Sequence, residues 1–121
     1  EAIELQKNAS TADHTVERSF VHVLDVCEAI HSTLHWLQNQ TNICEAFDIS
    51  GEITSIQALL DIISEVTQVG INTIDPSYAT VTLERLASTS QKAKNILNWS
   101  AHRSVNKMIE DEWNFYRTTL H

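Results

Sequence analysis

The chain has 121 residues, a mass of 13.7 kDa and a formal net charge of -8, from 8 Lys plus Arg against 16 Asp plus Glu. So short a chain predicts a single domain, and the acidic excess disfavours general binding to nucleic-acid phosphates or anionic membranes. Gly51 and Gly70 are its only glycines. The glycine-rich loops of Rossmann and P-loop proteins and the GxSxG elbow of α/β-hydrolases are therefore excluded from this sequence.

Cysteine usage and hydropathy predict a cytoplasmic domain. Cys27 and Cys44 are the only cysteines and lack CxxC spacing, which favours reduced thiols over a disulfide framework. No apolar run is long enough to span a bilayer, and the first ten residues are neither basic nor apolar. We therefore expect neither a membrane span nor a signal peptide, and we interpret the Asn-x-Ser/Thr sequons as chance occurrences.

Short strands alternate with helices along the chain, which predicts an α/β or α+β domain that is richer in helix than in strand. Residues 1–7 are typical of a helix end, and residues 8–17 of a polar connector. β-branched and aromatic residues predict strands at 19–23, 46–50 and 71–74, whereas residues 80–86 fit either a strand or a loop.

Four helices are predicted, and each has a polar residue that can cap its N-terminus: Asp25, Thr54, Ser90 and Ser104. The first helix runs to about Gln38, and the third ends at Leu97. The second begins with a capping box, Thr54-Ser-Ile-Gln57, and ends at Gly70. Apolar faces follow the helical period at Val26, Ile30, Thr33, Leu34 and Leu37, at Ile56, Leu59, Leu60, Ile63 and Val66, and at Val105, Met108, Ile109, Trp113, Tyr116 and Leu120.

Histidines and carboxylates in these helices give weak signals of chemistry. His31 and His35 are one turn apart, with Cys27 one turn earlier, a spacing that can present metal ligands on one face. HEXXH is absent and the sequence places no third ligand, so we favour solvated histidines and assign no metal site. We also interpret the carboxylates at 110–112 as a solvated helix face and His22 as a structural histidine. The tryptophans are interpreted as core and helix-packing residues.

Five segments, taken in order, resemble the landmarks of one protein family. Residues 13–26 (DHTVERSFVHVLDV) resemble its GDGTQTRSFVHVDDV stretch, 46–51 (AFDISG) its YNIGSG, and 88–99 (STSQKAKNILNW) its ADTSKAKRELGW. The helix from Thr54 to the EVT at 65–67 and the last helix, with its Trp113 to Tyr116-Arg117 ending, are similar too. The family is that of the NAD-dependent epimerases and dehydratases, which are extended short-chain dehydrogenases/reductases typified by UDP-glucose 4-epimerase.

The resemblance covers only the C-terminal, substrate-binding lobe of that family. The family's glycine-rich NAD loop and its catalytic Ser and Tyr-x-x-x-Lys would lie upstream of Glu1. Tyr78 and Tyr116 are followed four residues later by Thr82 and Leu120, so neither supplies the Tyr–Lys pair. The resemblance therefore implies no catalytic and no cofactor-binding residue here, with NAD bound only if a Rossmann-bearing partner completes the chain.

Arg18 matches the family arginine that contacts the diphosphate of the nucleotide sugar, a role that suits the planar guanidinium. An ion pair of Arg18 with Glu17 or Asp13 at the surface is an equally good interpretation.

The family's second set of phosphate contacts comes from an R-x-G-D loop. Its arginine and aspartate positions hold Ala79 and Thr82 here, and Arg85 is the nearest cation that can substitute. Thr89 replaces the aspartate of ADTS, and Ser50 replaces the first glycine of IGSG. These departures fall on ligand-side positions, which indicates a retained fold with relaxed binding and weak or absent UDP-sugar affinity.

We therefore expect a nucleotide-sugar epimerase/dehydratase-like domain without catalytic activity of its own. Two alternatives remain open: half of a split NAD-dependent epimerase completed by a Rossmann-domain protein, or a non-catalytic dimeric interaction module. In the family, the helix at 25–38 and the strand at 46–49 pack against the nucleotide-binding half. Their apolar residues are kept here, so a homodimer is expected.

Overall fold

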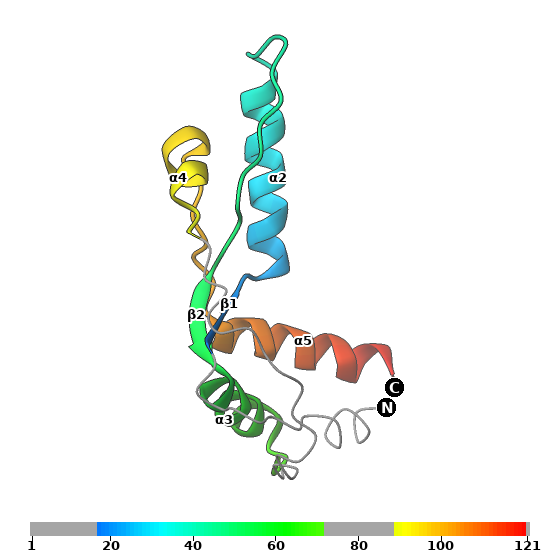
Figure 1. Ribbon diagram of the computed structural model, residues 1–121. Helices are drawn as coiled ribbons and strands as arrows, with labels where there is room; N and C mark the ends of the chain where they lie inside the picture. The colour runs from blue at the N-terminus through cyan, green and yellow to red at the C-terminus, as the bar shows by residue number, and fades with distance from the viewer. Residues whose placement is uncertain (1–16, 72–88, 121) are drawn as a thin grey trace.

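The computed structural model describes residues 17–71 and 89–120 (Figure 1). It is a small mixed domain in which helices outnumber strands, as the sequence predicts. The elements in chain order are β1 (Glu17–Phe20), α2 (Val23–Leu37), β2 (Glu52–Ser55), α3 (Ile56–Thr67), α4 (Gln91–Leu97) and α5 (Val105–Thr119). The predicted segments 1–7, 8–16 and 80–86, and all but the first residue of 71–74, lie outside the described residues.

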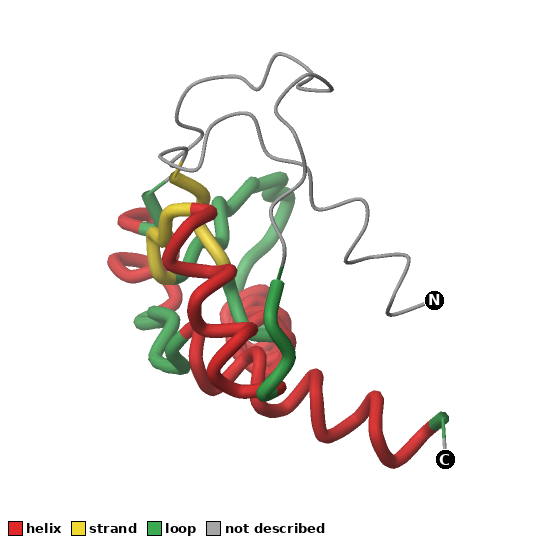
Figure 2. Tube along the Cα trace, turned by 90° about the horizontal axis from the view of Figure 1, so that it is seen from below, coloured by secondary structure: helices red, strands yellow, loops and turns green. Residues whose placement is uncertain are grey.

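A two-stranded antiparallel sheet joins the helices. β1 pairs with β2 from Glu17 opposite Ser55 to Phe20 opposite Glu52. Figure 1 shows α2 and α4 on one side of this sheet and α3 and α5 on the other, and Figure 2 gives the view from below. Gly51 lies just before β2 and close to the end of β1. A Cβ there would be 1.9 Å from the Phe20 carbonyl oxygen, so this position requires glycine.

The main hydrophobic core lies between α2 and α4. Ala29, Ala93, Leu97 and Trp99 are buried there, with partly buried side chains packed around them: Val21, Trp36, Phe47, Ile49 and Ala101. Trp36 and Phe47 meet edge to face with ring centroids 5.5 Å apart, a favourable aromatic geometry. On the other side of the sheet, Leu60 of α3 and Val105 of α5 are buried.

The start of α2 differs from the prediction. β1 begins two residues early and ends at Phe20, and the N-cap of α2 is His22, whose Nδ1 accepts a hydrogen bond from the Leu24 amide (3.0 Å). Asp25 is therefore not the cap: it lies in the first turn, fully buried. The reason is tertiary, because the carboxylate of Asp25 is bound by residues 102 and 103.

The prediction of a strand at 46–50 is also wrong. These residues are not part of a ladder in the described chain, and the strand that forms is β2, at 52–55. Side chains at the start of α4 bind this backbone instead. Lys92 of α4 donates to the Ala46 carbonyl (2.8 Å), and the hydroxyl of Ser90, the residue before α4, accepts from the Ser50 amide (2.7 Å).

The cap of α3 is shifted by one residue, and its end by three. Ser55, not Thr54, is the N-cap, and its hydroxyl accepts from the Ala58 amide (3.1 Å). Thr54 is buried in β2, where it pairs with Arg18. α3 ends at Thr67, because Gln68 takes the left-handed conformation (φ 57°) before Gly70 is reached.

The predicted starts of α4 and α5 are confirmed. Ser104 caps α5 by accepting from the Lys107 amide (3.2 Å). Ser90 precedes α4, although its hydroxyl bonds to Ser50 rather than to its own helix. In the part of the chain that the structure describes, no helix has the length and apolar character needed to cross a bilayer.

Candidate functional site

Arg18, the predicted diphosphate contact, lies on β1 and is half-buried. Its Nη1 donates to the Glu17 carbonyl oxygen (2.9 Å). Its backbone is fixed by the pairing with Thr54 of β2. Arg85, the second predicted cation, lies outside the described residues, so the two are not placed relative to each other. Of the two predicted cations, only Arg18 is therefore placed by the structure.

A second polar cluster, which the sequence did not indicate, joins α2 to the segment before α5. Asp25 is fully buried, and its Oδ2 accepts the backbone amides of His102 (3.2 Å) and Arg103 (3.1 Å). The Arg103 guanidinium donates to Asp25 Oδ1 and to Glu28 Oε1, the latter at 2.9 Å. We call Asp25, Glu28, His102 and Arg103 the α2 clasp.

The electrostatics of the α2 clasp favour ionised Asp25. Burial opposes ionisation, but hydrogen bonds from the Arg103 amide and guanidinium and from the His102 amide outweigh it. The pKa of Asp25 is therefore held below its usual value. Glu28, and then Asp25, stabilise the protonated guanidinium and raise the pKa of Arg103. The α2 clasp thus sets two carboxylates against one guanidinium, and Asp25 Oδ2 also accepts two backbone amides.

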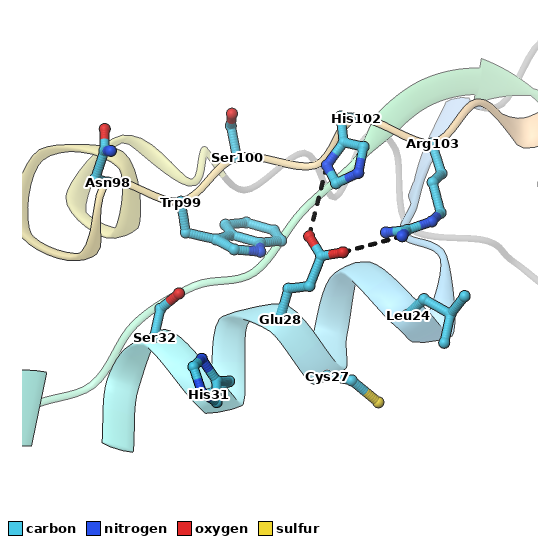
Figure 3. A pocket seen from close by; sticks show the side chains of 10 residues that line it. All are labelled: Leu24, Cys27, Glu28, His31, Ser32, Asn98, Trp99, Ser100, His102 and Arg103. Carbon is cyan, nitrogen blue, oxygen red and sulfur yellow. Dashed lines mark hydrogen bonds and ion pairs between the residues drawn. The ribbon is translucent and has the colours of Figure 1, made fainter. Parts of the chain in front are cut away.

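An open pocket of about 640 Å³ lies beside the α2 clasp (Figure 3). Its walls come from the first half of α2 and from the segment that follows α4. They comprise Leu24, Cys27, Glu28, His31, Ser32, Asn98, Trp99, Ser100, His102 and Arg103. Ligand atoms of Asp25, Glu28 and His102 lie within 4.8 Å of one another, a metal-like grouping among the described residues. Arg103 pairs with both carboxylates, so the geometry is explained as a structural clasp.

The helix-face histidines are not part of this grouping. His31 and His35 are exposed on α2, as expected, and Cys27 is an exposed free thiol whose sulfur points away from the clasp in Figure 3. Cys44 is likewise free and exposed. The i, i+4 spacing of the histidines therefore gathers no third ligand among the described residues.

One acidic residue of α5 is more than a solvated face, which corrects the prediction for 110–112. Asp111 Oδ1 accepts from Lys107 Nζ (2.6 Å), and its Oδ2 lies 3.1 Å from His22 Nε2. The hydrogen bond from Lys107 is the main cause of a lowered pKa of Asp111. His22 is buried with both ring nitrogens bonded, which agrees with a structural histidine. Glu110 and Glu112 are exposed.

The comparisons with known proteins lead to one class. No family model matches the chain. A crystal structure of UDP-glucose 4-epimerase matches with a TM-score of 0.79 and 28% identity over 94% of this chain and 35% of that chain. The domain thus has the fold of the C-terminal lobe of the NAD-dependent epimerases.

The curated relatives agree with this class. UDP-glucose 4-epimerase from Mycoplasma pneumoniae is 32% identical over 88% of this chain, and UDP-glucose 4-epimerase 2 from Oryza sativa is 28% identical over 92%. The chain spans 32% and 28% of their respective lengths. The chain is thus similar to about a third of each of these epimerases.

Proposed function

We propose that this chain is the substrate-side lobe of a nucleotide-sugar epimerase/dehydratase-like protein and has no catalytic activity on its own. The observation that carries the proposal is the epimerase-lobe fold in a sequence that has neither a glycine-rich dinucleotide loop nor a Tyr-x-x-x-Lys pair. The two cysteines, free and exposed, suit a reducing compartment, and we propose the cytoplasm.

Arg18 is the proposed contact to the diphosphate of a UDP-sugar. Its position in β1, held by pairing with β2, gives the guanidinium a rigid base, and a charged fork suits two phosphate oxygens. Arg85 is the proposed second cation. Losing one charged hydrogen bond costs about 1.5–3 kcal/mol, or roughly ten- to over a hundredfold in affinity, so we propose weak UDP-sugar binding.

Calorimetric titration of the 121-residue chain tests this proposal. We expect no NAD affinity tighter than about 100 μM, because a dinucleotide pyrophosphate needs a glycine-lined helix N-terminus that this sequence lacks. We expect weak or undetectable heat with UDP-glucose. Any binding should be reduced by Arg18→Ala but not by Arg117→Ala, which removes an exposed charge at the end of α5.

Two results contradict the proposal. NAD binding tighter than about 100 μM would show a cofactor site that the sequence does not contain. Low-micromolar UDP-glucose affinity that Arg18→Ala abolishes would show an intact rather than a relaxed substrate site.

A second candidate function is one half of a split epimerase. Under this hypothesis the chain supplies the third of the enzyme that it matches in each relative, and a second polypeptide supplies the rest. A Rossmann-bearing chain with GxxGxxG and YxxxK would then supply NAD and the catalytic residues. Epimerisation of UDP-glucose by the mixture of the two chains, and by neither chain alone, is the expected result.

A further inference from the structure

His22 joins the start of α2 to α5. The residue is 3% exposed, and both nitrogens of its ring have hydrogen-bond partners. Nδ1 accepts from the backbone amide of Leu24 (3.0 Å), which makes His22 the N-cap of α2. Nε2 lies 3.1 Å from Oδ2 of Asp111, 89 positions later in the chain. One buried imidazole thus connects the end of one helix to the side of another.

These two hydrogen bonds fix the position of the ring proton. A backbone amide only donates, so Nδ1 must be the unprotonated nitrogen while Leu24 is bound to it. The proton of the neutral ring then lies on Nε2, which donates it to the carboxylate of Asp111. In this state both ring nitrogens are satisfied, as a buried polar side chain requires.

The carboxylate that faces the ring is ionised. Asp111 also accepts from Lys107 of α5, and this hydrogen bond is the main cause of its lowered pKa. Among the described residues, Asp111 is the only carboxylate that forms an ion pair with His22. On α2, the carboxylate of Asp25 is bound within the α2 clasp. The charges at the ring are therefore those of Asp111 and, behind it, Lys107.

We propose that His22 is a pH-sensitive connector, which caps α2 when neutral and releases that cap when protonated. Histidine is the side chain whose charge ordinarily changes between about pH 5 and 8. A second proton can go only to Nδ1, where it would point at the N–H of Leu24, and two donors do not form a hydrogen bond. Protonation therefore removes the cap, whereas the bond from Nε2 to Asp111 becomes charged on both sides and is strengthened.

Release of the cap affects the pocket beside the α2 clasp. Leu24 and Glu28, in the first turns of α2, belong to the wall of this pocket. A helix that loses its N-cap is destabilised from that end, because its first amides lose an acceptor. We therefore expect acid to loosen this wall while the ring stays attached to α5. The inference does not depend on the proposed nucleotide-sugar chemistry.

NMR spectroscopy of the 121-residue chain, labelled with nitrogen-15, tests both states. At about pH 7.5, the imidazole nitrogen shifts should show His22 protonated at Nε2 and unprotonated at Nδ1. When the pH is lowered to about 5, the protection of the Leu24 amide against hydrogen exchange should fall about fivefold, the factor expected for loss of a typical helix cap. Protection is taken relative to the unfolded chain at the same pH, which removes the pH dependence of exchange itself.

Two substitutions separate the two functions of the ring. His22→Asn keeps an acceptor at the cap but does not titrate, so the protection of Leu24 should stay high at both pH values. His22→Gln keeps an amide donor that can reach Asp111 but gives up the cap, so protection should be low at both. The matched control is His35→Asn, which removes an exposed histidine of the same helix and should respond to pH as the wild type does.

Several outcomes overturn the proposal. One is a neutral ring that carries its proton on Nδ1, and another is a ring that stays neutral down to about pH 5. Undiminished protection of Leu24 beside a protonated ring also overturns it, because the cap would then be independent of the charge of His22. So does a pH response that persists in His22→Asn, which would belong to another group. The wild-type titration decides the first three outcomes without requiring that either His22 variant fold.

Discussion

Replacing Asp25 by asparagine is expected to lower the free energy of unfolding by about 3 kcal/mol, the lower end of the range for a broken buried ion pair. Asp25 is fully buried, and its two oxygens accept two backbone amides and a guanidinium. An isosteric amide keeps the shape but turns one acceptor into a donor that faces Arg103. The lower end applies because the Arg103 side chain is 24% exposed and can recover some hydration.

Urea denaturation followed by circular dichroism measures this effect. The matched control is Glu28→Gln, which removes the other carboxylate that Arg103 contacts but at a 45% exposed position. Exposed ion pairs contribute little, so the control should lose less than about 1 kcal/mol. Equal losses for the two variants would show that burial of Asp25 does not determine the strength of the α2 clasp.

The acid dependence of stability gives a second measurement on the same residue. The pKa of Asp25 is lowered in the folded state, so its contribution is complete above the unfolded value of about 3.9 and is lost as the pH falls through the folded value. Asp111, whose pKa is also lowered, acts in the same direction. Below about pH 4, the stability of the wild type should fall more steeply than that of Asp25→Asn.

Local signals predicted the elements whose ends are fixed locally. Ser90 and Ser104 precede α4 and α5 as expected, because a polar residue before an apolar-periodic run marks a helix start in most contexts. The ordered resemblance from residue 13 to Arg117 also gave the correct fold. Both kinds of signal are contained in short stretches of sequence.

Errors occurred where a distant residue decides the local structure. Asp25 has the chemistry of a cap, but Arg103, 78 positions later, binds its carboxylate, and His22 becomes the cap. Residues 46–50 have strand composition, yet a strand needs a partner, and side chains at the start of α4 bind their backbone instead. Composition alone contains no information about such partners.

The candidate site was predicted only in part for the same reason. Arg18 was predicted as a phosphate contact because it lies within a motif, and that role stays a prediction. The α2 clasp was missed because it joins Asp25 and Glu28 to residues that are distant in sequence. A weak signal was available. Asp25 and Glu28 are three positions apart on one helix, so they share a face and repel each other unless a cation lies between them. Nothing in the sequence identified Arg103 as that cation.

Replacing Trp99 by alanine is expected to have the largest effect, a loss of about 3–5 kcal/mol. Trp99 is 4% exposed and belongs to the main core between α2 and α4, with Ala29, Ala93 and Leu97. Alanine would leave a cavity where the indole packs, and the buried neighbours Ala29 and Ala93 are too small to fill it. The substitution also removes the hydrogen bond from Nε1 to the Asp25 carbonyl oxygen (2.9 Å).

Because small domains are stable by only about 5–15 kcal/mol, Trp99→Ala can be too unstable to measure, and Trp99→Phe provides the graded variant. Phenylalanine keeps most of the apolar volume but loses the Nε1 donor, so it should be intermediate between wild type and Trp99→Ala. Trp113→Ala is the control: its ring stacks on Tyr116 near the outer end of α5, only partly buried. Thermal unfolding orders the four proteins, and a Trp113→Ala loss as large as that of Trp99→Ala would contradict the placement of the core between α2 and α4.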